Sequence, residues 1–204
     1  VYESKVKSDV ARNLRTLREL RNYLVHDKRT SVIDAFVVTD DAIEYLKKRI
    51  EILRQPLRAI DVCVPKHHIL FGYESSRLLP LLDQMVKRNI SHVPVLDLSD
   101  RLMGIFSGES LFQTLIEAGS KAIDAKTMLS DIAGFLAIDK HVGEQYLFVG
   151  RNALLEDLDD LFQSTHQTTK KLKMLLVTET GKPNEKILGL ITPLDLLAEQ
   201  AKLF

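Results

Sequence analysis

The sequence predicts an α+β protein in which an all-helical N-terminal arm precedes two copies of one β-α-β-β-α unit. Three observations support this class. Apolar residues recur at helical spacing before Pro56, short β-branched runs alternate with helical stretches after it, and the order of these elements returns once. We expect the arm to span residues 1–56, the first copy residues 57–125 and the second copy residues 126–204.

The arm is expected to contain two amphipathic helices. The second begins after Thr39, where Asp41 and Glu44 have capping-box spacing, and it ends at Pro56. Two helices cannot enclose a core, so their apolar faces must pack on the rest of the protein, on further helices or on a second copy. We therefore expect a homodimer. The first apolar stripe consists of Val6, Val10, Leu14, Leu17, Leu20, Leu24 and Val25, and the second of Ile43, Leu46, Ile50 and Leu53.

The two copies are predicted from matching runs of residues. Leu102–Ser107 corresponds position by position to Ile187–Thr192, which favours a pseudo-symmetric pair over a solenoid. Strands are expected at 60–64, 68–71, 92–97 and 102–106 in the first copy and at 146–149, 173–178 and 187–191 in the second. Helices are expected near 76–88 and 109–118, at 153–164 and from 193.

Three segments of this repeat carry a family resemblance. They are His92-Val93-Pro94-Val95, the run from Gly104 to Ser110, and the run from Gly189 to Asp195. Together they resemble the CBS-domain pair, or Bateman module, over roughly residues 57–202. The resemblance implies a tandem CBS-domain fold with a regulatory function. Such pairs bind AMP, ADP, ATP or a related adenosyl compound in the clefts between the copies and transmit occupancy to an effector.

The resemblance also implies which residues bind the ligand. A hydroxyl at the first turn of a helix lies beside free backbone N–H groups, which suits a phosphate, and a carboxylate one turn later accepts ribose hydroxyls. Thr192 and Asp195 match both roles in the second copy. In the first copy Ser107 keeps the hydroxyl, but Ser110 replaces the carboxylate, so we expect one good cleft.

Three further residues are candidates for the same ligand. His92 precedes Pro94 where the family places a basic side chain, Lys173 takes a similar position in the second copy, and Ser76 offers a hydroxyl before a helix. A purely structural interpretation stays open for the whole set. In it, Thr192 caps a helix, Asp195 is a favourable first-turn acid, and the basic residues lie on strand surfaces.

The arm carries a second resemblance, in Arg21-Asn22-Tyr23-Leu24-Val25-His26. This run is similar to the Arg-polar-x-x-x-His motif of HEPN domains, which implies a metal-independent ribonuclease with Arg21 and His26 as catalytic residues. Arg21 falls within the apolar stripe, where an unpaired guanidinium is costly, and His26 titrates near neutral pH. The alternative places Arg21 at an interface edge and His26 at a helix end.

Composition limits the function classes. The 28 Lys and Arg residues balance the 28 Asp and Glu residues, so the chain lacks the overall positive field of a duplex nucleic-acid binder, and RNA contact would be local. No apolar run is long enough for a membrane span. Cys63 is the single cysteine, which excludes an internal disulfide and suits the cytoplasm.

Other motifs give little support for an enzyme. Glycine-rich phosphate loops and the Gly-x-Ser-x-Gly motif are absent, which argues against kinase, dehydrogenase and hydrolase activities. His67 and His68 are adjacent, and His141 and His166 are isolated, so no metal site is expected. A structural dimerisation module with degenerate clefts is a further alternative. The chain begins with Val1, and we expect it to be part of a longer protein.

Overall fold

The computed structural model describes residues 18–19, 39–41, 43–44, 47, 50, 56–119, 123–164 and 169–203. The chain divides into two compact units, residues 1–57 and 58–204. In the first unit, the Ile43 amide donates to the Thr39 carbonyl at 3.1 Å, and the described positions from Asp40 to Ile50 are helical, as predicted. Arg21 and His26 lie outside the described residues, so their catalytic role stays a prediction of the sequence.

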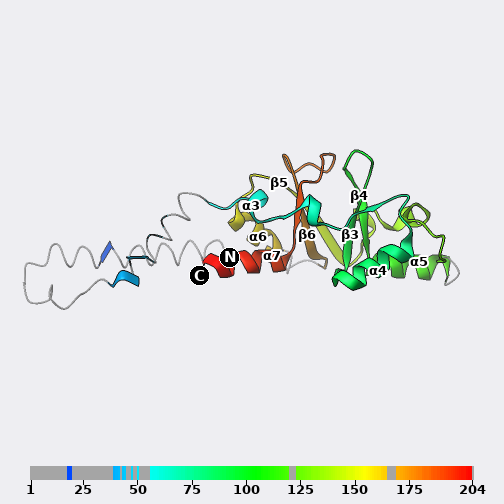
Figure 1. Ribbon diagram of the computed structural model, residues 1–204, viewed down its shortest axis with the longest axis horizontal. Coiled ribbons are helices and arrows are strands. Elements are labelled where there is room, and N and C mark those ends of the chain that lie inside the picture. The colour runs from blue at the N-terminus through cyan, green and yellow to red at the C-terminus, as the bar shows by residue number, and fades with distance from the viewer. Residues whose placement is uncertain are drawn as a thin grey trace, which may run out of the picture. The chain divides into compact units, whose positions relative to one another are not determined.

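The second unit contains two sheets (Figure 1). One has the strand order β1-β7-β6-β5 and the other the order β2-β3-β4. The strands are β1 (Val64–Pro65), β2 (Gly72–Tyr73), β3 (His92–Leu96), β4 (Leu102–Ser107), β5 (Glu144–Gly150), β6 (Lys171–Thr178) and β7 (Gly189–Ile191).

Helices accompany each sheet, α4 and α5 with the first copy and α6 and α7 with the second (Figure 1). No helix in the described parts of the chain is long and apolar enough to cross a membrane. The α-helices are α3 (Ala59–Val62), α4 (Leu78–Arg88), α5 (Gly108–Ala118), α6 (Leu155–Ser164) and α7 (Pro193–Leu203). The 3-10 helices are η2 (Lys66–His68), η4 (Leu129–Phe135) and η5 (Ile138–Lys140).

The strand register confirms the predicted repeat. In each copy an antiparallel hairpin joins two strands, and a third strand runs parallel to the first strand of that hairpin. Val95 pairs with Gly104 in the first copy, and Val177 pairs with Gly189 in the second. The sheets therefore have the same pairing at the positions that the sequence matched.

Two apolar clusters hold the unit together. One lies under the first sheet and contains the buried face of α4, formed by Leu78, Leu81 and Met85. The other draws on both sheets, with Leu96 and Ile105 from the first copy packed with residues of the second. Burying a side chain such as Leu78 completely stabilises the fold by about 1.5–3 kcal/mol.

Segments from each copy also pack on the sheet of the other. Strand β1 pairs with β7, and the Ile105 amide donates to the Leu136 carbonyl at 2.7 Å. Both contacts require a glycine beside them. A Cβ on Gly104 would overlap the Leu136 carbonyl, and one on Gly189 would lie 2.7 Å from the Val64 oxygen. These two glycines therefore serve close approach of the backbone.

Two strands expected in the first copy are wrong. Residues 59–62 form the short helix α3, because the Asp61 carboxylate accepts from the Arg58 amide at 2.9 Å and caps a helical turn. Residues 69–71 belong to no strand. Their side chains instead alternate between the two cores, with Leu70 on the first cluster and Ile69 and Phe71 on the second. An alternating apolar pattern thus arises here without ladder hydrogen bonds.

Candidate functional site

The predicted site residues gather mainly at two strand-to-helix junctions. The first junction runs from Ser107 to Ser110, where β4 ends and α5 begins, and the second runs from Thr192 to Asp195, where β7 ends and α7 begins. A hydroxyl residue precedes each helix: the Ser107 hydroxyl accepts from the Glu109 amide, and the Thr192 hydroxyl donates to the Asp195 carboxylate. The two junctions are equivalent by sequence but differ in their chemistry.

The first junction is closed by hydrogen bonds within itself. The Ser107 amide donates to the Ser110 hydroxyl at 2.9 Å, and that hydroxyl donates to the Ser107 carbonyl at 2.9 Å. The Ser107 hydroxyl accepts from the Glu109 amide at 3.2 Å. Both serines are buried. Ser110 therefore acts in capping, and its side chain is not presented to a ribose.

The carboxylate of Glu144 occupies the place beside Ser107 where a phosphate was predicted. The Ser107 hydroxyl donates to Glu144 Oε2 at 2.9 Å, and the Tyr146 hydroxyl donates to the same oxygen at 2.6 Å. His92 Nε2 lies 2.9 Å from Glu144 Oε1. Two of the predicted phosphate ligands, Ser107 and His92, are therefore brought together, but on an internal anion.

Electrostatics keep this carboxylate ionised. Burial alone raises the pKa of Glu144, but the contacts with His92 and Tyr146 outweigh burial and hold the pKa far below its usual range. Burial and the neighbouring Glu144 charge raise the pKa of Tyr146 above its usual range, so the phenol stays protonated and keeps donating. Glu144 is a permanent negative charge at the first junction.

Lys173 also points toward the first junction, not the second as predicted. Its Nζ lies 4.0 Å from Glu144 Oε1. The predicted equivalence with His92 is wrong by one residue. Leu175 pairs with Ile191 as Val93 pairs with Phe106, so the residue equivalent to His92 is Met174. Since neighbouring side chains on a strand point to opposite faces, this shift of one residue reverses the side on which Lys173 lies.

The second junction has the carboxylate that the first lacks. Asp195 Oδ2 accepts from the Thr192 amide at 2.8 Å and from the Thr192 hydroxyl at 2.7 Å. Both residues are half-buried. In the described part of the chain, Asp195 Oδ1 makes no hydrogen bond. One carboxylate oxygen thus fixes the turn, and the other is available to a ligand.

Cys63 lies beside the second junction. A Cβ added to Gly189, the first residue of β7, would lie 2.5 Å from the Cys63 Sγ. Burial raises the pKa of the Cys63 thiol, and the carboxylates of Asp61 and Asp195 add to that increase. The thiol is therefore protonated at neutral pH and behaves as a small, partly buried apolar group.

The Ser76 side chain makes no hydrogen bond to a described residue of either junction. Its hydroxyl accepts from the Tyr73 amide at 2.9 Å and so stabilises the turn between β2 and α4.

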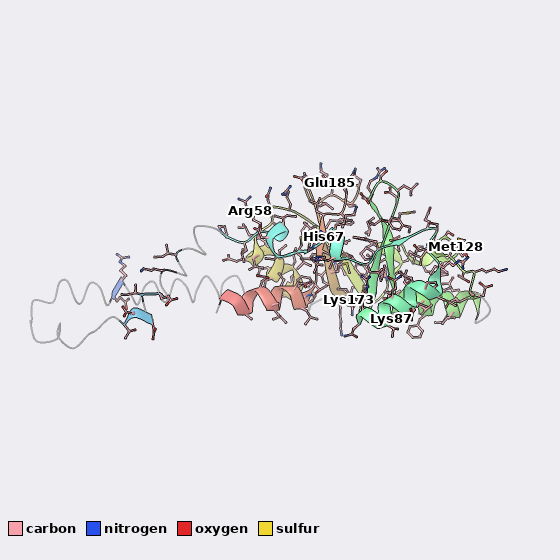
Figure 2. All side chains as sticks on the ribbon, in the orientation of Figure 1. Arg58, His67, Lys87, Met128, Lys173 and Glu185 are labelled. Carbon is pink, nitrogen blue, oxygen red and sulfur yellow. The ribbon has the colours of Figure 1, made fainter. Side chains whose placement is uncertain are left out.

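The structure also shows a groove of about 530 Å³ at the opposite ends of the strands. None of the predicted site residues lines it. Glu185 lines the groove, and Figure 2 shows Glu185 and Lys173 at opposite ends of the sheet. The complete lining is Ser99, Arg101, Glu179, Asn184, Glu185, Lys186 and Leu188.

Sequence reasoning missed the residues at the centre of the first junction. Glu144, Tyr146 and His141 are near one another in sequence, but they reach Ser107 and His92 only because β5 lies beside the strand-to-helix turn of the other copy. No sequence motif identifies such a cluster, because an acid at the start of a strand and an isolated histidine are both common without one. An excess of polar residues at the start of an apolar strand was the one available hint.

The comparisons with known proteins agree with this architecture. The CBS-domain family model matches residues 64–117. No curated protein matches the chain.

Solved structures match over most of their own length. A protein from Vibrio cholerae named as an acetoin utilization protein (AcuB) is 21% identical, with 72% of this chain and 93% of that chain covered and a TM-score of 0.53. CBSX2 in complex with AMP is 19% identical, with 72% and 97% covered and a TM-score of 0.51. The CBS-pair protein CBSX2 from Arabidopsis thaliana is 18% identical, with 73% and 97% covered and a TM-score of 0.50.

The described unit therefore has the fold of a CBS-domain pair, and residues 64–117 are a CBS domain.

Proposed function

We propose that this protein is a regulatory module that binds an adenine nucleotide or a related adenosyl compound at the second junction. Thr192 contacts the phosphate, and Asp195 accepts the ribose hydroxyls. AMP is the ligand to test first, because CBSX2, which has the same fold, has been solved in complex with AMP.

The observation that carries the proposal is the arrangement of the Asp195 carboxylate. Its Oδ2 is held by two hydrogen bonds from Thr192, and this fixes the orientation of the whole group. Its Oδ1 then points away from the cap with no partner among the described residues. A carboxylate oriented in advance binds a diol at a lower entropic cost than a mobile one.

The first junction argues for a single binding site per chain. A nucleotide phosphate there would meet the negative charge of Glu144, and the phosphate would have to displace it from three hydrogen-bonding partners. Like charges at such a distance repel, and breaking a buried network leaves its donors unpaired. The second junction faces no acid equivalent to Glu144, because strand β2 of the first copy begins only at Gly72, the position equivalent to Val149 of β5.

Coupling to the arm and dimerisation are part of the proposal. Ile43 and Ile50, two members of the predicted apolar seam, are exposed within the described residues of the first unit. A second copy of the chain would cover this seam. A dimeric mass by light scattering at micromolar concentration is expected, and a monomeric mass would remove dimerisation from the proposal.

A thermal-shift panel of AMP, ADP, ATP and S-adenosylmethionine tests the ligand assignment. Wild-type protein is expected to gain thermal stability with at least one compound. Asp195→Asn keeps the cap acceptor but loses the charge, and it is expected to lose most of that gain while its apo melting temperature stays near wild type. Asp131→Asn is the matched control, because Asp131 caps η4 by accepting from the Met128 amide at 2.8 Å. An equal ligand response in wild type and Asp195→Asn would refute the assignment.

A further inference from the structure

His141 is the most deeply buried imidazole among the described residues, with none of its surface exposed. Its Nε2 lies 3.2 Å from the Ile105 carbonyl oxygen. A carbonyl only accepts, so Nε2 is the nitrogen that carries the proton, and Nδ1 of the neutral ring presents a lone pair. Within the described chain, Nδ1 has no hydrogen-bond partner.

The unpartnered nitrogen faces another acceptor. Nδ1 lies 3.4 Å from Glu144 Oε2, the oxygen that also accepts from the hydroxyls of Ser107 and Tyr146. The other oxygen, Oε1, faces His92 and Lys173. Two lone pairs directed at each other repel unless a cation lies between them. A proton or a metal ion between His141 Nδ1 and Glu144 Oε2 would satisfy both acceptors.

A second carboxylate faces the same point. Glu109, in the first turn of α5, accepts from the Gly143 amide at 3.2 Å, and the Val142 amide also donates to it. These bonds hold its carboxylate beside the start of β5. One ligand atom each from Glu109, His141 and Glu144 lies within 4.8 Å of the other two. Three side chains from two segments, the first turn of α5 and the stretch from His141 into β5, thus converge.

We propose that Glu109, His141 and Glu144 form a site for a divalent transition-metal ion, with zinc as the expected ion. Zinc binds imidazole nitrogen and carboxylate oxygen at about 2.0–2.2 Å, so two ligands of a tetrahedral ion lie roughly 3.4 Å apart. That is the separation of His141 Nδ1 and Glu144 Oε2. Magnesium and calcium favour sites built from oxygen alone, and the buried imidazole therefore selects against them.

The geometry also supplies the support that zinc ligands require. The hydrogen bond from His141 Nε2 to the Ile105 carbonyl fixes the tautomer and the ring orientation. The backbone amides of Val142 and Gly143 orient Glu109 in the same way. The metal site revises the expectation from sequence, in which His141 is isolated, and it does not depend on nucleotide binding at the second junction.

Isothermal titration of the full chain with Zn²⁺, after treatment with EDTA and dialysis, tests the site. Wild-type protein is expected to bind one ion per chain. Glu109→Gln keeps the side-chain volume and the acceptor for the two amides, and it is expected to weaken binding by at least tenfold. Glu117→Gln, on the exposed face of the same helix, is the matched control and is expected to bind like wild type.

A second pair of variants separates this site from the exposed histidines. His141→Asn is expected to lose Zn²⁺ binding, whereas His67→Asn, in the exposed part of η2, is expected to keep it. Co²⁺ absorption in the visible range reports directly on ligand number and geometry, and melting curves in EDTA show whether each variant is folded. No saturable binding, binding unchanged in Glu109→Gln, or binding lost from His67→Asn would each overturn the proposal.

Discussion

The two strand-to-helix junctions arise from equivalent sequences, yet the polar groups of the first are bonded within the protein, whereas the second has a carboxylate oxygen without a partner among the described residues. At the first junction, Ser107 and His92 are bonded to Glu144, a carboxylate from the other copy. At the second, the junction's own Asp195 has an oxygen with no partner in the described chain. A carboxylate is present in both, but it fills the site in one and leaves it open to a ligand in the other.

This difference shows why a repeat motif alone does not establish two ligand sites. The motif describes only the turn, whereas the charge that faces the turn comes from a strand of the opposite copy. Glu144 begins β5, and the short strand β2 has no equivalent residue. Divergence of one copy can therefore close a site in the other copy.

Removing the central carboxylate is the largest perturbation expected. Glu144→Ala leaves Ser107, Tyr146 and His92 without their acceptor in a region where the Glu144 side chain is only 14% exposed. Breaking a buried charge network in this way costs about 3–5 kcal/mol. Chemical denaturation measures the loss, and Glu117→Ala, on an exposed helix face, is expected to cost far less. A cost for Glu144→Ala as small as that of the control would mean that the first junction is not held by this network.

The glycines that precede the junctions give the next largest effect. Gly104→Ala and Gly189→Ala each place a methyl group against backbone of the other copy's segment, and overpacking of this kind costs about 1–3 kcal/mol. Gly108→Ala is the control, since its Cβ has nothing within 4 Å. Urea denaturation of the three variants measures the effect. Equal stability of all three would contradict the close approach seen at both sheets.

The caps of the two junctions are expected to separate stability from ligand binding. Ser110→Ala removes a buried hydroxyl that both accepts from and donates to Ser107, at a cost of about 1 kcal/mol. Its thermal shift with AMP is expected to equal that of wild type, because the first junction takes no ligand. A reduced shift with AMP would place nucleotide at the first junction.

The smallest effect is expected at Lys173. Its ammonium lies 4.0 Å from Glu144, and the side chain is about one-third exposed, so solvent screens the pair. Lys173→Met is expected to change the unfolding free energy by less than about 1 kcal/mol and to leave nucleotide binding unchanged. Loss of nucleotide binding in this variant would restore the phosphate role that the sequence predicted for Lys173.

Much of the fold could be predicted because local and long-range patterns agree. The periodicity of Leu78, Leu81 and Met85 and the repeated hairpins indicate the same elements that the structure contains. The failures lie at residues 59–71, where apolar side chains alternate between two cores without strand pairing. That alternation depends on where the second copy lies, which no local pattern records.

The candidate site could be predicted only in part for the same reason. Thr192 and Asp195 belong to one continuous motif, so their proximity follows from the sequence. The contact between His92 and Glu144 joins residues 52 positions apart in two different copies. The sequence places Lys173 at the wrong junction because loop lengths differ between the copies and hide the register, and a shift of one residue is enough to reverse a side chain.

The number of AMP molecules bound per chain tests the account most directly. Isothermal titration of the wild-type chain with AMP is expected to give one site, which Asp195→Ala removes and Ser107→Ala leaves intact. Two sites per chain would contradict the account, as would a single site lost from Ser107→Ala and kept in Asp195→Ala.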